Sequence, residues 1–62
     1  MTDDLPPTLG APATRALHAA GHRDLASLDG VEARSLLALH GVGPRAVRLL
    51  REALTARGLD LR

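Results

Sequence analysis

The residues with the clearest chemical potential form one short stretch, Gly41-Val42-Gly43-Pro44-Arg45, which separates two apolar segments. Glycine permits positive φ angles and close approach of the backbone to another group, and proline suits the first position of a helix. The first N–H groups of a helix lack partners within the helix and carry partial positive charge, so they attract anions. This spacing predicts a tight turn that leads into a helix N-terminus and binds an anion. We also expect Gly43 to adopt positive φ, a conformation that strains a β-branched side chain.

Arginines are placed to add side-chain charge to this site. Arg45 follows the proline in the first helical turn, and Arg48 lies one turn later on the same side. Arg15 follows the proline of an earlier stretch, 9–17, which repeats the order of glycine, proline, arginine and apolar residues. The repeat predicts a pseudo-symmetric pair of helix starts, both suited to phosphate.

The stretch 36–50 resembles the helix-hairpin-helix motif, in which a Gly-hydrophobic-Gly hairpin binds DNA phosphates through backbone N–H groups without reading the base sequence. Over residues 9–61 the chain is also similar, without gaps, to the C-terminal domain of the bacterial RNA polymerase α subunit. The resemblance implies a bacterial, helical DNA-binding domain whose first long helix and hairpin both meet the minor groove. By position, Gly43 and Arg45 match the family's glycine and basic residue at the last helix.

Three positions depart from this family. Its arginine at the start of the first helix falls on Pro12, its neighbouring asparagine on Arg15, and an acidic residue of its last helix on Leu49. The departures affect promoter recognition and leave the phosphate site intact. Because phosphate contacts carry no base information, we expect weak sequence discrimination. The candidate DNA-binding residues are Arg15, Gly41, Val42, Gly43, Arg45 and Arg48.

Hydrophobic periodicity predicts helices and no strand. The predicted helices cover about 12–20, 23–28, 31–39 and 44–57. The expected fold class is all-α, a compact bundle of four short helices. The bundle is expected to be of the helix-hairpin-helix or SAM-like kind, similar to the C-terminal domain of the polymerase α subunit. Residues 1–8 are expected to form a loose N-terminal arm, with Leu5 touching the core, and residues 9–62 a single domain.

Glycines and acidic residues predict where these helices end and begin. Gly21 and Gly58 suit the left-handed position after a helix, and Leu59 then follows Gly58 at the place of a Schellman contact. Asp29 and Glu32 have the spacing of a capping box before the third helix. The buried face of the last helix is expected to contain Ala46, Val47, Leu50, Ala53 and Leu54.

Composition restricts the possible functions. A chain of 62 residues holds one small domain, and its lack of cysteine excludes disulfides and thiolate metal sites. The absence of Phe, Tyr and Trp excludes proteins that stack bases on aromatic side chains. Eight arginines without a lysine fit a GC-rich genome better than a functional choice, so only the placement of the arginines is informative. The net charge of +1 predicts modest affinity for DNA.

We expect no catalysis, no cofactor and no metal site. His18 and His22 have the spacing of a helical metal pair, but Gly21 interrupts the helix and no third ligand is evident, so exposure to solvent is the simpler interpretation. His40 beside the hairpin is either a neutral structural side chain or a neighbour of a phosphate. The apolar runs are too short for a bilayer, and the start of the chain lacks a signal-peptide pattern, so we expect a cytoplasmic protein.

A protein-interaction module is the second function that the sequence allows. Small helical domains of this kind also bind proteins, and Leu37 and Leu49 would then form an exposed apolar patch. A protein partner or a homo-oligomer would also compensate for the modest charge of a DNA-binding domain. A basic face around the two helix starts favours DNA, whereas an apolar patch favours a protein partner.

Overall fold

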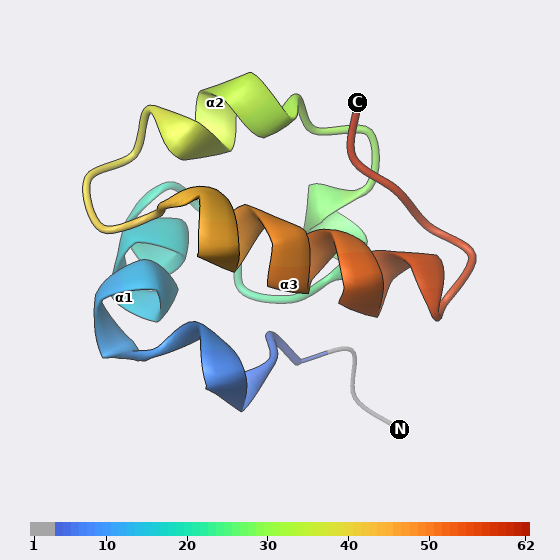
Figure 1. The fold of residues 1–62 in the computed structure, drawn as a ribbon, viewed down its shortest axis with the longest axis horizontal. Helices are drawn as coiled ribbons and strands as arrows, with labels where there is room; N and C mark the ends of the chain where they lie inside the picture. The colour runs from blue at the N-terminus through green and yellow to red at the C-terminus, as the bar shows by residue number, and fades with distance from the viewer. Residues whose placement is uncertain (1–3) are drawn as a thin grey trace.

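Helix α3 (Pro44–Thr55) crosses the middle of the molecule, and the other elements pack around it (Figure 1). The computed structural model describes residues 4–62. Helix α1 (Ala11–Ala19) lies near the start of α3, and α2 (Ala33–Leu37) runs back above α3 and joins it through the hairpin. Two short 3₁₀ turns, η1 (Pro7–Leu9) and η2 (Ala26–Leu28), complete the order η1-α1-η2-α2-α3. The all-α expectation is confirmed for the described residues, whose one extended pairing is an isolated bridge at Asp4.

The prediction of four helices is wrong, because the structure contains three α-helices in residues 4–62. The segment 23–28 forms only the turn η2 instead of a helix. Its conformation is fixed locally, since the Ser27 N–H donates to the Asp24 carboxylate at 2.9 Å and the Ser27 hydroxyl donates to the Asp24 carbonyl at 2.7 Å. Glycines at 21 and 30 leave too few residues between them to offset the cost of starting a longer helix.

Helix α2 is shorter than the predicted 31–39 because the C-terminal segment occupies its expected first turn. The Arg62 N–H donates to the Val31 carbonyl at 2.9 Å, and the Ala33 N–H donates to the Arg62 carbonyl at 3.1 Å. The expected capping box is also wrong. The Asp29 carboxylate accepts a hydrogen bond from the Asp60 N–H at 3.2 Å, and α2 has Glu32 at its N-cap with no side-chain cap.

The two predicted glycine stops are confirmed. Gly21 has φ +93° and Gly58 has φ +75°, both in the left-handed region. The Leu59 N–H donates to the Leu54 carbonyl at 2.9 Å, which is the expected Schellman bond after α3. The His22 N–H makes the equivalent bond to the Leu17 carbonyl at 2.8 Å after α1. Both helices therefore end where their sequence predicts, within two residues.

The core is built almost entirely from leucine and small aliphatic side chains. Six leucines are fully buried, at positions 17, 25, 28, 36, 50 and 54. The expected buried face of α3 is confirmed, with Ala53 partly buried at its edge. Leu61, near the end of the chain, is also buried, at 7% exposure. The C-terminal segment is thus part of the core.

The described part of the predicted loose arm is docked on the domain. Residues 1–3 lie outside the described residues. Leu5 is partly buried and packs against the core, as expected, and Leu9 of η1 is buried. The turn η1 contacts both α1 and α3, and these contacts attach the N-terminal segment to the rest of the domain. None of the helices in residues 4–62 has the length and apolar character needed to cross a bilayer.

Candidate nucleic-acid interface

In the hairpin between α2 and α3, Gly41 is the glycine whose backbone conformation favours glycine over other residues. Gly41 has φ +99°, in the left-handed region, and the Val42 N–H donates to the Leu39 carbonyl at 3.1 Å to close the turn. Gly43 has φ −108° and ψ −179°, which is ordinary extended backbone. The expectation of positive φ at Gly43 is therefore wrong. Pro44 explains the difference, because a residue before proline is driven to the extended region.

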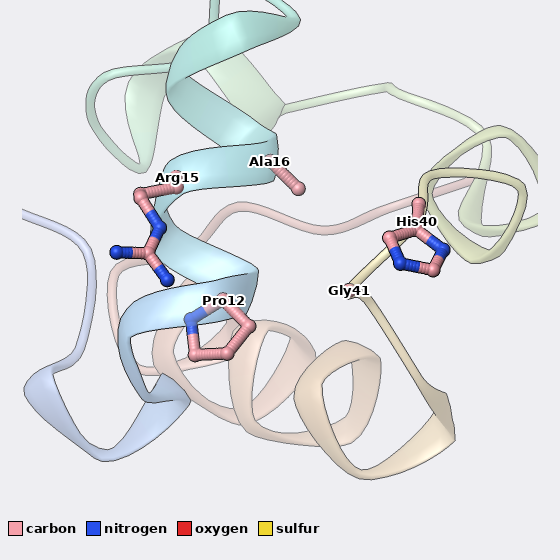
Figure 2. A pocket seen from close by; sticks show the side chains of 5 residues that line it. All are labelled: Pro12, Arg15, Ala16, His40 and Gly41. Atoms are coloured by element: carbon pink, nitrogen blue, oxygen red, sulfur yellow. The ribbon is translucent and has the colours of Figure 1, made fainter.

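Gly41 also brings the hairpin into close contact with the start of α1. A Cβ atom at Gly41 would lie 3.0 Å from the carbonyl oxygen of Pro12, with no other residue type able to fit without a shift. Around this contact lies an open pocket of about 440 Å³, lined by Pro12, Arg15, Ala16, His40 and Gly41. Figure 2 shows His40 across the open space from Ala16, with Arg15 on the other side of α1. The two predicted helix starts are neighbours.

Several backbone N–H groups at this end have no hydrogen-bond acceptor within residues 4–62. They belong to Gly41, Gly43, Arg45 and Ala46. The first intrahelical bond of α3 is donated by Val47 to the Gly43 carbonyl at 3.1 Å, and no side chain caps the helix. Val42 differs from its neighbours, because its N–H is bonded within the turn and its side chain is buried. Its part in the hairpin is to anchor the turn to the core.

The three candidate arginines are exposed. Arg15 lies in the middle of α1, and Arg45 and Arg48 lie in the first two turns of α3. None of the three forms an ion pair or side-chain hydrogen bond with any other part of the described chain. The ion pair seen in residues 4–62 is instead Arg51 with Asp60, whose Nε and Oδ1 atoms are 3.7 Å apart. The guanidinium groups around the hairpin are thus available to an external anion.

Charge is segregated along the chain, and sequence reasoning overlooked this pattern. No Asp or Glu occurs in residues 5–23 or 33–51, although these segments hold six of the eight arginines and all three histidines. They form α1, α2, the hairpin and most of α3. Among the described acidic residues, Asp4 forms a bridge with Asp24 just before η2, Asp29 and Glu32 precede α2, Glu52 lies in the third turn of α3, and Asp60 lies in the C-terminal segment. In Figure 1, the η2 region, the end of α3 and the C-terminal segment lie toward the side opposite the hairpin. The hairpin end is consequently basic although the net charge is only +1.

The three histidines differ in their surroundings. His18 is exposed, whereas His22 is half-buried and its Nδ1 atom is enclosed without a hydrogen-bond partner, so the expectation of solvent exposure is wrong for His22. Within the described part of the chain, no three His, Cys, Asp or Glu side chains are grouped to hold a metal ion. His40 lines the pocket beside Gly41.

The two leucines considered for a protein partner differ in exposure. Leu37 on α2 is 45% exposed. Leu49 on α3 is partly buried and packs against the core. They therefore contribute unequally to any apolar surface.

Comparisons with protein-family models, curated proteins and solved structures give no match to this chain. The function of the chain is therefore inferred from its own residues and geometry.

Proposed function

We propose that this protein is a small, non-catalytic DNA-binding domain that holds the phosphate backbone between the hairpin and the start of α1. The close approach of Gly41 to Pro12 is the observation that carries the proposal, because it joins two helix starts into one surface. The unpaired N–H groups of Gly41, Gly43 and Arg45 supply neutral donors on that surface. Arg15, in the pocket lining, supplies charge.

Electrostatics supports DNA as the partner. Arg15, Arg45 and Arg48 are exposed and free of ion pairs within residues 4–62, and the same end carries no carboxylate on α1, α2 or the first two turns of α3. Each phosphate neutralised on duplex DNA contributes about 0.9 to the slope of log K against log salt, so three contacts predict a slope of about −2.7. Such a slope corresponds to modest affinity, as expected for one small domain.

The sequence resemblance supports the same proposal. A helix-hairpin-helix domain similar to the C-terminal domain of the RNA polymerase α subunit would be a bacterial, cytoplasmic protein that binds double-stranded DNA with little base discrimination. The hairpin spacing Gly41-Val42-Gly43 and the basic Arg45 carry that resemblance. Binding by backbone donors and arginines needs no cofactor and no metal.

A salt-dependent titration tests the proposal. Purified protein is titrated with two unrelated duplexes of equal length at 20, 50, 100 and 200 mM salt, with fluorescence anisotropy as the readout. We expect similar affinities for both sequences and a slope of about −2 to −3. Arg45→Ala should reduce the slope by about 1, whereas Arg34→Ala, near the start of α2 and away from the hairpin, should not. A parent slope near zero would refute the proposal.

A protein-interaction module is the second proposal, supported by the exposure of Leu37. A single exposed leucine is common on soluble proteins, so this support is weaker than the charge pattern. A homo-oligomer is its simplest form. Sedimentation of the parent and of Leu37→Asp over a hundredfold range of concentration distinguishes the proposals, because only an interaction surface at Leu37 makes the two differ.

A further inference from the structure

His40 is a titratable group in the pocket that the proposed contacts do not use. It lines the space of about 440 Å³ together with Arg15 and Gly41. The pocket is open to solvent, and its volume is large enough to admit one phosphate with its sugar. His40 is exposed and has no hydrogen-bond partner within residues 4–62. Its imidazole faces the open space beside α1 (Figure 2).

We infer that this pocket holds one phosphate of the DNA backbone, and that protonated His40 contacts it, so that DNA binding strengthens as the pH falls. This inference rests on the proposed function. Histidine is the side chain whose charge ordinarily changes between pH 5 and 8. A protonated imidazole donates from both nitrogens, and a charge-assisted hydrogen bond to phosphate is stronger than a neutral one.

The ionisable groups on the three helices that flank the hairpin are cationic or neutral up to the third turn of α3. Arg15 of α1 lines the same pocket, His18 lies one turn further along α1, and Arg45 and Arg48 lie at the start of α3. On α2 itself the charged residue is Arg34. No carboxylate from these elements is available as a counter-charge until the third turn of α3.

A bound phosphate therefore supplies the counter-charge that protonated His40 lacks in the free protein. Binding is then coupled to uptake of a proton, and the affinity rises as the pH is lowered. Because the phosphodiester keeps its charge throughout pH 5.5–8.5, the effect originates in the protein.

The test is the DNA titration repeated at pH 5.5, 6.5, 7.5 and 8.5. For the parent, the slope of log K against log salt should steepen by about 0.9 between pH 8.5 and 5.5. A fourfold rise in salt then costs about 3.5-fold more affinity at pH 5.5 than at pH 8.5. His40→Gln keeps a neutral polar side chain and should abolish the change. His18→Gln is the matched control, because His18 is exposed on α1 and outside the pocket lining, and it should behave as the parent does.

Three outcomes would overturn the inference. If the parent binds DNA with a salt slope that does not change with pH, or if His40→Gln changes as the parent does, the inference fails and the proposed function stands. If the parent shows no salt-dependent binding at any pH, both fail.

A free-phosphate arm distinguishes the source of the anion. At pH 6, inorganic phosphate is added while the NMR signal of the His40 ring is followed. A shift of that signal without pH-dependent DNA binding would assign the pocket to a free phosphate and overturn the DNA assignment. Thermal unfolding at each pH confirms that the variants compared are folded.

Discussion

At the scale of single residues, the hairpin glycines have different roles despite their symmetric spacing. Gly41 needs both its positive φ and its missing side chain, because a Cβ atom there would lie only 3.0 Å from the Pro12 carbonyl oxygen. Gly43 is extended, and a Cβ atom there would meet nothing within 4 Å. Gly41 therefore sets the geometry of the turn, and Gly43 leaves free space at the N-terminus of α3.

This difference predicts unequal effects of two alanine substitutions. Gly41→Ala should lower the free energy of unfolding by about 1–3 kcal/mol, from left-handed backbone strain and the contact with Pro12. Gly43→Ala should change it by no more than about 0.5 kcal/mol, since its backbone and surroundings accept a methyl group. Urea unfolding of both variants measures the difference. Equal losses would contradict the assigned role of Gly41.

An acidic cap at Gly43 should separate stability from binding. Helix α3 has no side-chain cap, and an aspartate at the N-cap accepts hydrogen bonds from the first N–H groups and favours the helix dipole. Gly43→Asp should therefore raise the unfolding free energy by about 0.5–1 kcal/mol and weaken DNA binding, because the cap occupies the proposed phosphate donors. Ala26→Asp, with the same charge change in η2, is the control. Unchanged DNA affinity in Gly43→Asp would exclude the α3 N-terminus from the interface.

At the scale of elements, the C-terminal segment decides where α2 begins. It returns beside residues 30–33, where the Gly30 N–H donates to the Asp60 carbonyl at 2.8 Å and Arg62 pairs with Val31. These bonds hold the residues before α2 in an extended conformation and insert Leu61 into the core. A short final segment thus positions the helix that precedes the hairpin.

A matched pair of leucine substitutions measures this contribution. Leu61→Ala removes a side chain that is 7% exposed and should cost about 2–3 kcal/mol of unfolding free energy. Leu37→Ala removes one that is 45% exposed and should cost less than about 1 kcal/mol. Denaturant unfolding gives both values. A loss at Leu61 no larger than at Leu37 would show that the C-terminal segment contributes little to the core.

At the scale of the whole molecule, a nearly neutral chain has one basic end. The segments without carboxylates fold as α1, α2, the hairpin and most of α3, while the η2 region, the end of α3 and the C-terminal segment, which carry acidic residues, lie toward the other end (Figure 1). Opposite charges at the two ends orient the domain on an anionic partner. The contact of Gly41 with Pro12 brings the hairpin against α1, where Arg15 lines the same pocket from the side of the helix that faces away from His40.

Four titrations at low salt test whether both helix starts contact the same DNA. The proteins are the parent, Arg15→Ala, Arg45→Ala and the double variant. Each single variant should lower the salt slope by about 1 and the double variant by about 2, with differences that shrink at high salt. A loss from Arg45→Ala with none from Arg15→Ala would restrict the interface to the hairpin. No loss from either would refute the DNA proposal.

Local chemistry was enough to predict much of this protein from its sequence. Leucine and alanine at helical spacing determined the all-α class and the buried face of α3, because burial of that stripe requires only a helix and a core. Gly21 and Gly58 determined two helix ends, because the left-handed position after a helix strongly favours glycine. The position of Arg45 directly after the hairpin is likewise read from the sequence.

Tertiary contacts decided what local preference left open. Asp29 and Glu32 have the spacing of a capping box. However, the Asp29 carboxylate accepts a hydrogen bond from the Asp60 N–H, and the C-terminal segment shortens α2. Symmetric spacing does not reveal which hairpin glycine is constrained; that depends on the Pro12 carbonyl, which lies 29 positions before Gly41 in the chain. The pocket with His40 exists only because those two segments meet. Each of these features depends on atoms far apart in sequence, and only packing of the folded chain brings them together.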